Sequence, residues 1–414
     1  MKLESCIKIE YGKCEKPDNT IKRLEPSIKE LYEYTYVEEK VAEYLYWSAI
    51  FIDEFDFQCM GKGVAPGWSK AGALAEWAEW VSSRNVDLMP GYIAAHQKDL
   101  KEPHLNIEDL VSHVSTAVPS VIEQVKDTNC AKFWVDGYSL MDNRVVKVPI
   151  EFVRRISGPS GGAAGNRIEE AIVHATNEIF ERRTHITVLR QKLIMPTIDV
   201  ETIDSPIIQA QIDFIRSKGI EVYIKDLSFG GELPCVGTYF LDPNIPESSQ
   251  FHHSFKVGSS FNKEHALMRT FTEYTQGRKL DEFIKADKEE QARILNADFR
   301  NIKCIEGDDD NLLSAFMFGF VPYKNADFLK EGDLVPFETS EGFKDCLEDI
   351  EKAKEICAKL KKDYVIVDFT DPKVDFPVVQ VVIPGYSDIL PYHPTASDVL
   401  FQPWTRARIM ECYN

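Results

Sequence analysis

The segment SGPSGGAAGNRIEEAIVHATNEIFERR, residues 157–183, decides the fold prediction. It opens with the most glycine-rich loop of the chain and continues with apolar residues at helical spacing from about Arg167 to Leu189. At about 100° per residue, the apolar side chains gather on one helix face that can pack against a core. The loop ahead of the helix could offer backbone N–H groups to a phosphate, although a flexible turn is the simpler alternative.

The opposite face of this helix stacks acidic side chains. Glu170, His174, Glu178 and Glu181 fall within an arc of roughly 80°, with no basic residue among them, and Asn166 lies at its edge. A solvated face usually mixes Glu with Lys or Arg, because like charges four residues apart repel by about 0.2–0.5 kcal/mol per pair. For one helix alone, a face exposed to solvent stays the alternative interpretation. The other interpretation is that the acidic side chains bind Mg²⁺, which would neutralise their charge and share the phosphates of a nucleotide.

A second segment, GKGVAPGWSKAGALAEWAEW at residues 61–80, has a similar order of glycine-rich turn, small residues and acid. Glu76 and Glu79 lie three residues apart, and each is followed by a tryptophan, which indicates a partly buried helix face. Buried carboxylates need partners. We therefore expect this helix and the first one to face each other with Mg²⁺ between them, and Lys62 to add a positive charge near the phosphates.

A third segment, GSSFNKEHALMRTFTEYTQGR at residues 258–278, carries a basic residue on its polar face. Arg269, Glu273 and Gln276 follow at i, i+4 and i+7, so they share one side of the predicted helix. Two interpretations stay open. Arg269 either forms an intrahelical ion pair of small energetic value or directs its guanidinium at a phosphate.

Helical and strand patterns alternate along the rest of the chain, which predicts a mixed α/β (α+β) fold with sheets packed against amphipathic helices. We expect an N-terminal extension over residues 1–48 and a single large domain over residues 49–414. The predicted elements are a helix over 25–46, a strand over 51–63 that ends in a glycine-rich turn, a helix, turn and strand over 208–228, a helix over 341–360, and strands over 364–370 and 376–384.

Composition excludes several classes of protein. The 414 residues carry 48 Lys and Arg against 67 Asp and Glu, a net charge of −19, which argues against nucleic acid or an anionic membrane as partner. The N-terminus lacks the apolar core of a signal peptide, and no apolar run is long enough to span a membrane. Nine scattered cysteines without a C-x-x-C pair are typical of reduced thiols, so we expect a cytoplasmic protein.

Together, these segments resemble the YcaO family of ATP-dependent enzymes that modify peptide backbones. The stretch at 157–183 is similar to the central motif of that family, and the stretches at 61–80 and 258–278 are similar to two others. Two positions differ from the family pattern: Gly72 stands where the family often has Ser, and Trp80 where it often has Arg. The matching residues are Lys62, Glu76, Glu79, Asn166, Glu170, Glu178, Glu181, Arg182, Arg269, Glu273, Gln276 and Arg278.

The resemblance implies a YcaO-like fold with a nucleotide site between helix pairs, and ATP and Mg²⁺ as cofactors. In the family's chemistry a nucleophile adds to a backbone amide carbonyl, ATP phosphorylates the amide oxygen, and phosphate leaves to give a thioamide or an azoline. No residue is assigned as a catalytic acid, base or nucleophile. The implied Mg²⁺ ligands are Glu76, Glu79, Glu170, Glu178 and Glu181, and the implied nucleotide contacts are Lys62, Asn166, Arg182 and Arg269.

Among the branches of the family, the motif sequences most resemble the stand-alone bacterial branch, which is linked to methylthiolation of a small-subunit ribosomal protein. We expect no counterpart of that branch's C-terminal helical region. Two other functions stay open: an accessory factor for that methylthiolation, and a non-catalytic peptide-binding module that keeps the fold. The expected partners are a peptide or protein substrate and either a TfuA-like sulfur-delivery protein or a peptide-recognition protein, and a homodimer is one assembly considered.

Overall fold

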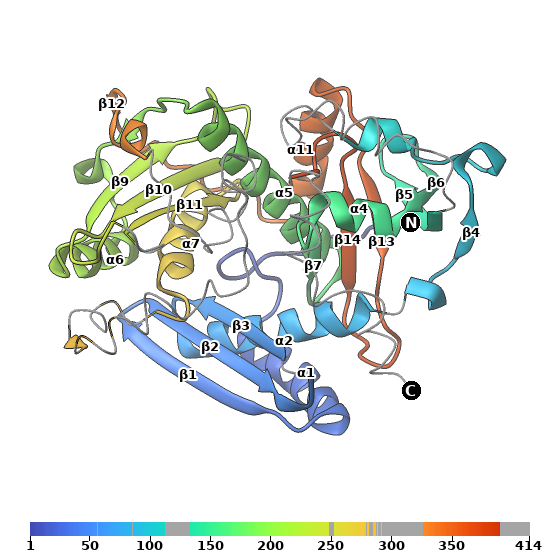
Figure 1. The fold of residues 1–414 in the computed structure, drawn as a ribbon, viewed down its shortest axis with the longest axis horizontal. Coiled ribbons are helices and arrows are strands. Elements are labelled where there is room, and N and C mark those ends of the chain that lie inside the picture. Colours follow the sequence, from blue (N-terminus) through green and yellow to red (C-terminus); the bar gives the residue numbers. More distant parts are fainter. Residues whose placement is uncertain are drawn as a thin grey trace.

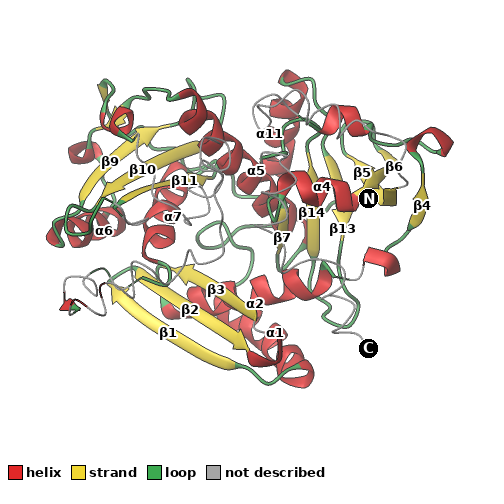
Figure 2. Cartoon of the chain, viewed as in Figure 1, coloured by secondary structure: helices red, strands yellow, loops and turns green. Residues whose placement is uncertain are grey.

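The computed structural model describes residues 1–55, 57–84, 86–111, 132–247, 252–278, 280, 285–286, 288, 291 and 326–389. Within these ranges the chain forms three β-sheets with helices packed on and between them (Figure 1). Each part of the molecule contains both strands and helices (Figure 2). The mixed α/β fold predicted from the sequence is therefore confirmed.

The first sheet is antiparallel in the order β1 (Thr35–Ala42), β2 (Leu45–Ile52) and β3 (Phe57–Gly63). The helix α2 (Pro66–Ser82) packs along β3 and β2, and α1 (Pro17–Leu31) packs on α2. The helix expected over 25–46 is wrong beyond Leu31, because residues 35–42 pair with the apolar strand β2 and tertiary pairing overrides local helix preference. A short 3₁₀ turn, Asp53–Phe55, links β2 to β3.

The glycine-rich turn expected at 61–63 is also wrong, since these residues are the end of β3. A Cβ atom on Gly61 would lie 1.9 Å from the carbonyl oxygen of Ser69 in α2, which is an impossible contact. Glycine at this position therefore serves the close approach of a strand to a helix. The same approach explains Gly72, whose Cβ would lie 3.3 Å from the Cα of Gly61.

The second sheet has the order β11-β10-β9-β8-β12. The helix α7 (Lys263–Thr275) covers β11 and β10, and α6 (Pro206–Ser217) packs on β9. The predicted helix, glycine turn and strand over 208–228 is confirmed by α6, by Gly219 at φ +75°, and by β9. The strands are β8 (Thr197–Ile198), β9 (Glu221–Asp226), β10 (Cys235–Leu241), β11 (His253–Ser259) and β12 (Leu334–Val335).

The third sheet has the order β4-β5-β13-β14-β7, with β6 paired to β5. Its edge strand β7 (Gly162–Ala164) is part of the glycine-rich segment and pairs with β14. The helix predicted over 341–360 is α11 (Cys346–Lys359), which begins with a capping box at Asp345 and Glu348. The remaining elements are β4 (Ile93–Ala95), β5 (Lys132–Ser139), β6 (Arg144–Pro149), α4 (Ile150–Ser157), β13 (Val365–Asp368) and β14 (Val378–Val382).

The long helix α5 (Ile168–Gln191) lies between the two larger sheets (Figure 1). It contacts β11 on one side, β14 and β7 on the other, and α11. This position buries most of the helix, so even Glu169, Glu170 and Glu181 have little exposed surface. Protein therefore covers most of the predicted acidic face, and solvent reaches little of it.

The N-terminal residues 1–16 lie across α5 and α11. Glu4 N–H donates to Glu169, and Lys8 forms an ion pair with Asp349. The strand β2 crosses the boundary expected at residue 49, and the division into an extension and a single domain stays a prediction. Among the helices that the structure describes, none combines the length and apolar character needed to cross a membrane.

Candidate active site

Three predicted carboxylates come together between α2 and α5. Burial and the charges of Glu178 and Glu76 raise the pKa of Glu79 well above its ordinary value. Burial also raises the pKa of Glu76 to about 7, with Glu178 adding to the rise, and that of Glu178 to about 7. The charge of Glu178 on α5 thus acts on Glu76 and Glu79 of α2, and the binding of Mg²⁺ between the two helices stays a prediction.

Solvent reaches this group although protein surrounds it. Glu76 is exposed by surface area, and yet burial among protein atoms is the main cause of its raised pKa. Its Oε2 accepts a hydrogen bond of 3.0 Å from the backbone N–H of Met60 in β3. The side chain of Glu178 keeps 24% exposure. These carboxylates are thus held in place but open to a small ligand.

The glycine-rich strand β7 takes part in this arrangement. A Cβ atom on Gly162 would lie 3.2 Å from Oε1 of Glu79, closer than most real Cβ contacts. A larger residue at this position would therefore press on the carboxylate. The glycine-rich segment contributes by leaving room beside an acidic side chain, which is a different role from the phosphate-binding loop considered from the sequence.

Positive side chains from three elements lie beside the carboxylates. Arg182 Nε lies 3.7 Å from Glu178 Oε1 and 4.0 Å from Glu181 Oε1. Arg269 Nη2 donates to Glu181 Oε2 at 3.4 Å, and Lys62 forms an ion pair with Glu273. Arg269 therefore joins α7 to α5 instead of pairing within its own helix, and its contact with a phosphate stays a prediction.

These cations repel each other. Burial and then the nearby Arg269 lower the pKa of Lys62 to about 7, with Arg182 and Lys256 adding to the effect. Glu181 lies between Arg182 and Arg269 and offsets part of this repulsion, and a further anion placed among the cations would be stabilised. The group therefore fits a phosphate chain.

The sequence did not identify Lys256 and Arg154. In β11, the side chain of Phe255 contacts His185 of α5, so Lys256 points to the opposite face of the sheet. Burial, followed by the charges of Arg182 and Arg278, lowers the pKa of Lys256 to about 8. Its place in the strand ahead of α7 was the one signal available. The charge of Arg154 in α4 favours the charged form of Glu79, and no sequence pattern pointed to this residue.

Asn166 and Glu170 lie at the N-terminal end of α5, outside the carboxylate group. The Nδ2 of Asn166 donates to both oxygens of Glu170 at 3.2 and 3.4 Å, and its Oδ1 accepts from Thr20 in α1 at 2.8 Å. Glu170 also accepts from the backbone N–H and the thiol of Cys14, at 3.0 and 2.6 Å. A ligand of Glu170 would have to displace these partners, so the role of Glu170 as a metal ligand stays a prediction.

His174 on the same face is bound to the N-terminal segment. The Nζ of Lys13 lies 2.8 and 3.1 Å from its two ring nitrogens. Burial and the charge of Lys13 lower the pKa of His174 far below its ordinary value. The imidazole is therefore neutral at physiological pH, and it supplies no charge to the site.

Trp80 is explained by packing. Its ring is 5% exposed, stacks on Phe57 with centroids 3.6 Å apart, and carries the guanidinium of Arg84 at 3.1 Å from its centroid. The indole therefore belongs to the core beneath the sheet β1–β3, while Glu76 and Glu79 of the same helix face α5.

The donor set fits Mg²⁺. Within the described ranges, no three His, Cys, Asp or Glu side chains are placed to hold a metal ion by themselves. Mg²⁺ takes oxygen ligands, keeps several waters and is commonly held by one or two carboxylates together with substrate phosphates. Carboxylates with raised pKa values on two facing helices, beside a group of cations, meet that requirement.

A family model described as YcaO cyclodehydratase, ATP- and Mg²⁺-binding, matches residues 60–387. The chain belongs to the YcaO family. Its family domain is thus of a type that binds ATP and Mg²⁺. Over 256 residues the chain is 27% identical to the Escherichia coli ribosomal protein S12 methylthiotransferase accessory factor YcaO, covering 60% of this chain and 40% of that protein. The chain therefore spans about two fifths of the length of this curated relative.

Solved YcaO structures share the fold. A heterocyclase in complex with substrate and cofactor matches with a TM-score of 0.70 and 19% identity, covering 93% of this chain and 54% of the other. YcaO from Methanopyrus kandleri bound with AMPPCP and Mg²⁺ matches with a TM-score of 0.62 and 15% identity, covering 94% and 96%. These similarities confirm the YcaO-like fold.

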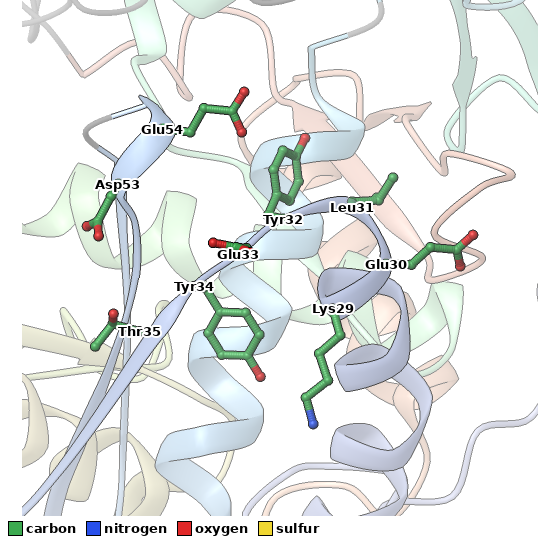
Figure 3. Close-up of a pocket in the computed structure, with 9 residues that line it drawn as sticks. All are labelled: Lys29, Glu30, Leu31, Tyr32, Glu33, Tyr34, Thr35, Asp53 and Glu54. Atoms are coloured by element: carbon green, nitrogen blue, oxygen red, sulfur yellow. The ribbon is translucent and has the colours of Figure 1, made fainter.

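A cavity of about 560 Å³ lies elsewhere, at the end of the first sheet (Figure 3). The C-terminal end of α1, the start of β1 and the turn after β2 line it, with Tyr32, Tyr34 and several charged side chains at its wall. It contains none of the predicted site residues. The chemistry of the carboxylate group therefore defines the candidate active site, and this cavity does not.

Proposed function

We propose that this protein activates a peptide-backbone amide by ATP-dependent phosphorylation of the amide oxygen, which yields a thioamide or an azoline in a peptide or protein. The observation that carries the proposal is the raised pKa of Glu76 and Glu79 on α2 and of Glu178 on α5, together with the nearby cations Lys62, Arg182 and Arg269. Membership of the YcaO family supports it.

In this proposal Glu76, Glu79, Glu178 and Glu181 would hold Mg²⁺, directly or through its waters. The bound metal would neutralise the charge that develops on the transferred phosphoryl group. Burial raises the pKa of three of these carboxylates, and a neighbouring carboxylate adds to the rise for Glu76, Glu79 and Glu178. A bound divalent cation would offset the cost of holding these charges together, which supports the assignment. Glu181 lies beside them, joined to Arg182 and Arg269.

The cations have a separate task. Lys62, Arg182 and Arg269 would orient the phosphates and stabilise negative charge on the leaving phosphate. A phosphate beside Lys62 would favour its ammonium form and raise the depressed pKa back toward the ordinary value. Phosphoryl transfer depends mainly on such positioning and electrostatic stabilisation, so the proposal needs no protein nucleophile.

A specific test replaces Glu79 by Gln, which keeps the shape of the side chain and removes the charge. We expect Mg-ATP binding, measured by calorimetry, to weaken by about 10–100-fold, the range found when groups that support a metal are lost. Glu351→Gln on the exposed face of α11, with a side chain 66% exposed, is the matched control and should bind as the unmodified protein does. Unchanged binding in folded Glu79→Gln would contradict the metal assignment.

Product analysis distinguishes the two chemistries. With a candidate peptide, ATP and sulfide, a thioamide exchanges oxygen for sulfur, whereas an azoline loses water from a Cys, Ser or Thr residue. A TfuA-like partner would favour the first product and a peptide-recognition partner the second. Peptide modification that stops in Glu79→Gln would also argue against a non-catalytic binding module.

A second candidate function is an accessory role in methylthiolation of a ribosomal protein. The observation that favours it is the 27% identity to the E. coli accessory factor. In a deletion strain, loss of the methylthio group, restored equally by the unmodified gene and by Glu79→Gln, would support an accessory role without ATP chemistry. Restoration by the unmodified gene alone would assign both functions to the same site.

A further inference from the structure

The cavity at the end of the first sheet has an acidic and aromatic lining. Four of the nine residues that line it are acidic, and one is basic. That basic residue, Lys29, pairs with Glu25 of the same helix at 3.3 Å. The lining therefore presents negative charge that its own lysine does not neutralise.

Two of the acids point into the cavity. Figure 3 shows Glu33, from the link between α1 and β1, and Glu54, from the turn after β2, directed into the space between these two segments, whereas Glu30 points away from it. Neither Glu33 nor Glu54 forms an ion pair with any residue that the structure describes. A concave surface with charge of one sign focuses the electric field and attracts the opposite charge. The cavity thus favours a cationic ligand.

The aromatic part of the lining favours a Lys or Arg side chain as that cation. The rings of Tyr32 and Tyr34 are half-buried, and residues outside the cavity hold both: Tyr32 packs edge-on against Trp77 with centroids 6.4 Å apart, and the hydroxyl of Tyr34 donates to Glu25 at 3.3 Å. Tyrosine rings attract ammonium and guanidinium groups and cover their aliphatic stems. A metal ion fits less well, because no three acidic side chains in the described ranges are placed to hold one.

The strand β1 begins at the cavity and lies at the edge of its sheet. Thr35, its first residue, lines the cavity. One side of β1 pairs with β2, and among the described strands none pairs with the other side. Figure 1 shows β1 as the outer strand of this sheet. Alternate residues of an edge strand direct their backbone N–H and C=O groups outward, where an extended peptide can pair with them.

The end of β1 away from the cavity carries features that discourage such pairing. The register shifts between Lys40 and Ala42, and the ammonium group of Lys40 lies 5.5 Å from the ring centroid of Tyr46. Lysines and bulges hinder the approach of another strand to a sheet edge. From Thr35 to Lys40 the register with β2 is regular, and Val37 in this stretch is 38% exposed. The half of β1 next to the cavity is thus the part open to a partner strand.

We propose that the outer edge of β1 and the cavity at its start form a docking site for an extended peptide segment that carries Lys or Arg. The backbone of this segment would pair with Thr35–Lys40, a length of about 20 Å. Its basic side chain would enter the cavity between Glu33 and Glu54, against the tyrosine rings. The docking site is separate from the candidate active site, since none of the predicted site residues lines the cavity.

A second copy of this chain is a poorer occupant than a basic peptide. Its own β1 carries Glu38 and Glu39, so two paired β1 edges would bring like charges together. The net charge of −19 adds to the repulsion between two copies and attracts a basic segment instead. The inference does not rest on the proposed function, because pairing at this edge needs neither ATP nor Mg²⁺.

The test measures binding of a fluorescent peptide to the full chain by anisotropy, without nucleotide or Mg²⁺. The probe has arginine at both ends and alternating valine and threonine between them, so it can pair in either direction. We expect this peptide to bind. A peptide with glutamate in place of arginine, and an arginine peptide with every internal backbone nitrogen methylated, should each bind at least about tenfold more weakly.

Two double variants locate the site. Glu33→Gln with Glu54→Gln should weaken binding of the arginine peptide at least about threefold, as expected when two partly exposed ion pairs are lost. Glu351→Gln with Glu355→Gln is the matched control, because it removes the same charge from α11, where these side chains are 66% and 62% exposed, and it should bind as the unmodified protein does.

Equal binding of the methylated and unmethylated peptides would overturn the proposal, because cations would then be held without strand pairing. Equal weakening by the two double variants would also overturn it, since binding would follow net charge and not the cavity. Dimerisation of the protein without any binding of the arginine peptide would assign the edge to a second copy.

Discussion

Replacing Glu178 by Gln should stabilise the protein at alkaline pH while it damages the site. Burial raises the pKa of Glu178 from 4.5 to about 7 in the folded chain. At about 1.36 kcal/mol per pKa unit, this rise corresponds to at most about 3.4 kcal/mol of destabilisation when the carboxylate is charged. Because the side chain keeps 24% exposure and lies 3.7 Å from Arg182, we expect a net effect of about 1–2 kcal/mol.

The sign follows from proton binding. Between pH 4.5 and 7 the folded chain holds a proton on Glu178 that the unfolded chain has lost, so the stability of the unmodified protein falls as pH rises through this range and stays low above it. The Gln variant lacks this titration. Its advantage should therefore be largest at pH 8 and mostly gone at pH 5.

Scanning calorimetry measures the effect. Unfolding of 414 residues carries an entropy of about 0.9 kcal/mol per kelvin, at about 2.1 cal/mol/K per residue, so the gain corresponds to about 1–2 °C in Tm at pH 8. Added Mg²⁺ should raise the Tm of the unmodified protein more than that of Glu178→Gln. Glu351→Gln should behave as the unmodified protein in both respects. A lower Tm for Glu178→Gln at pH 8 would refute the reasoning, since it would mean that the charge stabilises the fold.

Three further predictions test other parts of the structure. Gly61→Ala should lower the free energy of unfolding by at least about 2 kcal/mol in urea titrations, because its Cβ would lie 1.9 Å from a backbone oxygen. Gly72→Ala, whose Cβ contact in mid-helix is 3.3 Å, should change this free energy by less than about 1 kcal/mol. Lys256 loses its charge as pH rises through about 8, whereas Arg keeps its charge. The ratio of the Mg-ATP affinity of Lys256→Arg to that of the unmodified protein, measured by calorimetry, should therefore be larger at pH 9 than at pH 7. Trp80→Arg, although it restores the family residue, should destabilise the fold by about 3–5 kcal/mol in the same urea titrations, because it removes a buried ring stacked on Phe57.

The helices that carry the site could be predicted because their apolar residues recur at helical spacing. The structure places α5 over Ile168–Gln191, where the sequence predicted a helix from about Arg167 to Leu189. The error over 35–46 has the opposite cause. Residues 35–42 contain two Glu, two Val and one Tyr with weak periodicity, and pairing with β2 decided their conformation.

The metal-binding hypothesis rested on the spacing of acids within single helices, and spacing cannot show which helix faces which. Glu76, Glu79 and Glu178 do come together across α2 and α5. Glu170, on the same helical face as Glu178, instead binds Cys14 and Asn166 two turns away. A helical wheel gives the angular position of each side chain around the helix axis. It does not show that another segment of the chain can cover one end of the acidic face while the other end stays accessible.

The sequence by itself determined that this chain forms a mixed α/β fold of the YcaO type, that its acids gather on two helix faces, and that its excess negative charge is compatible with Mg²⁺ and phosphate. The YcaO type follows from the resemblance of three motifs to that family, and the other properties follow from local periodicity and from residue types at short spacing. Tertiary structure alone decided that Lys256 lies near Lys62 and Arg182, and that Cys14 of the N-terminal segment binds Glu170. Such groups depend on contacts between residues far apart in the chain, and no local pattern encodes which strand or segment will be the neighbour.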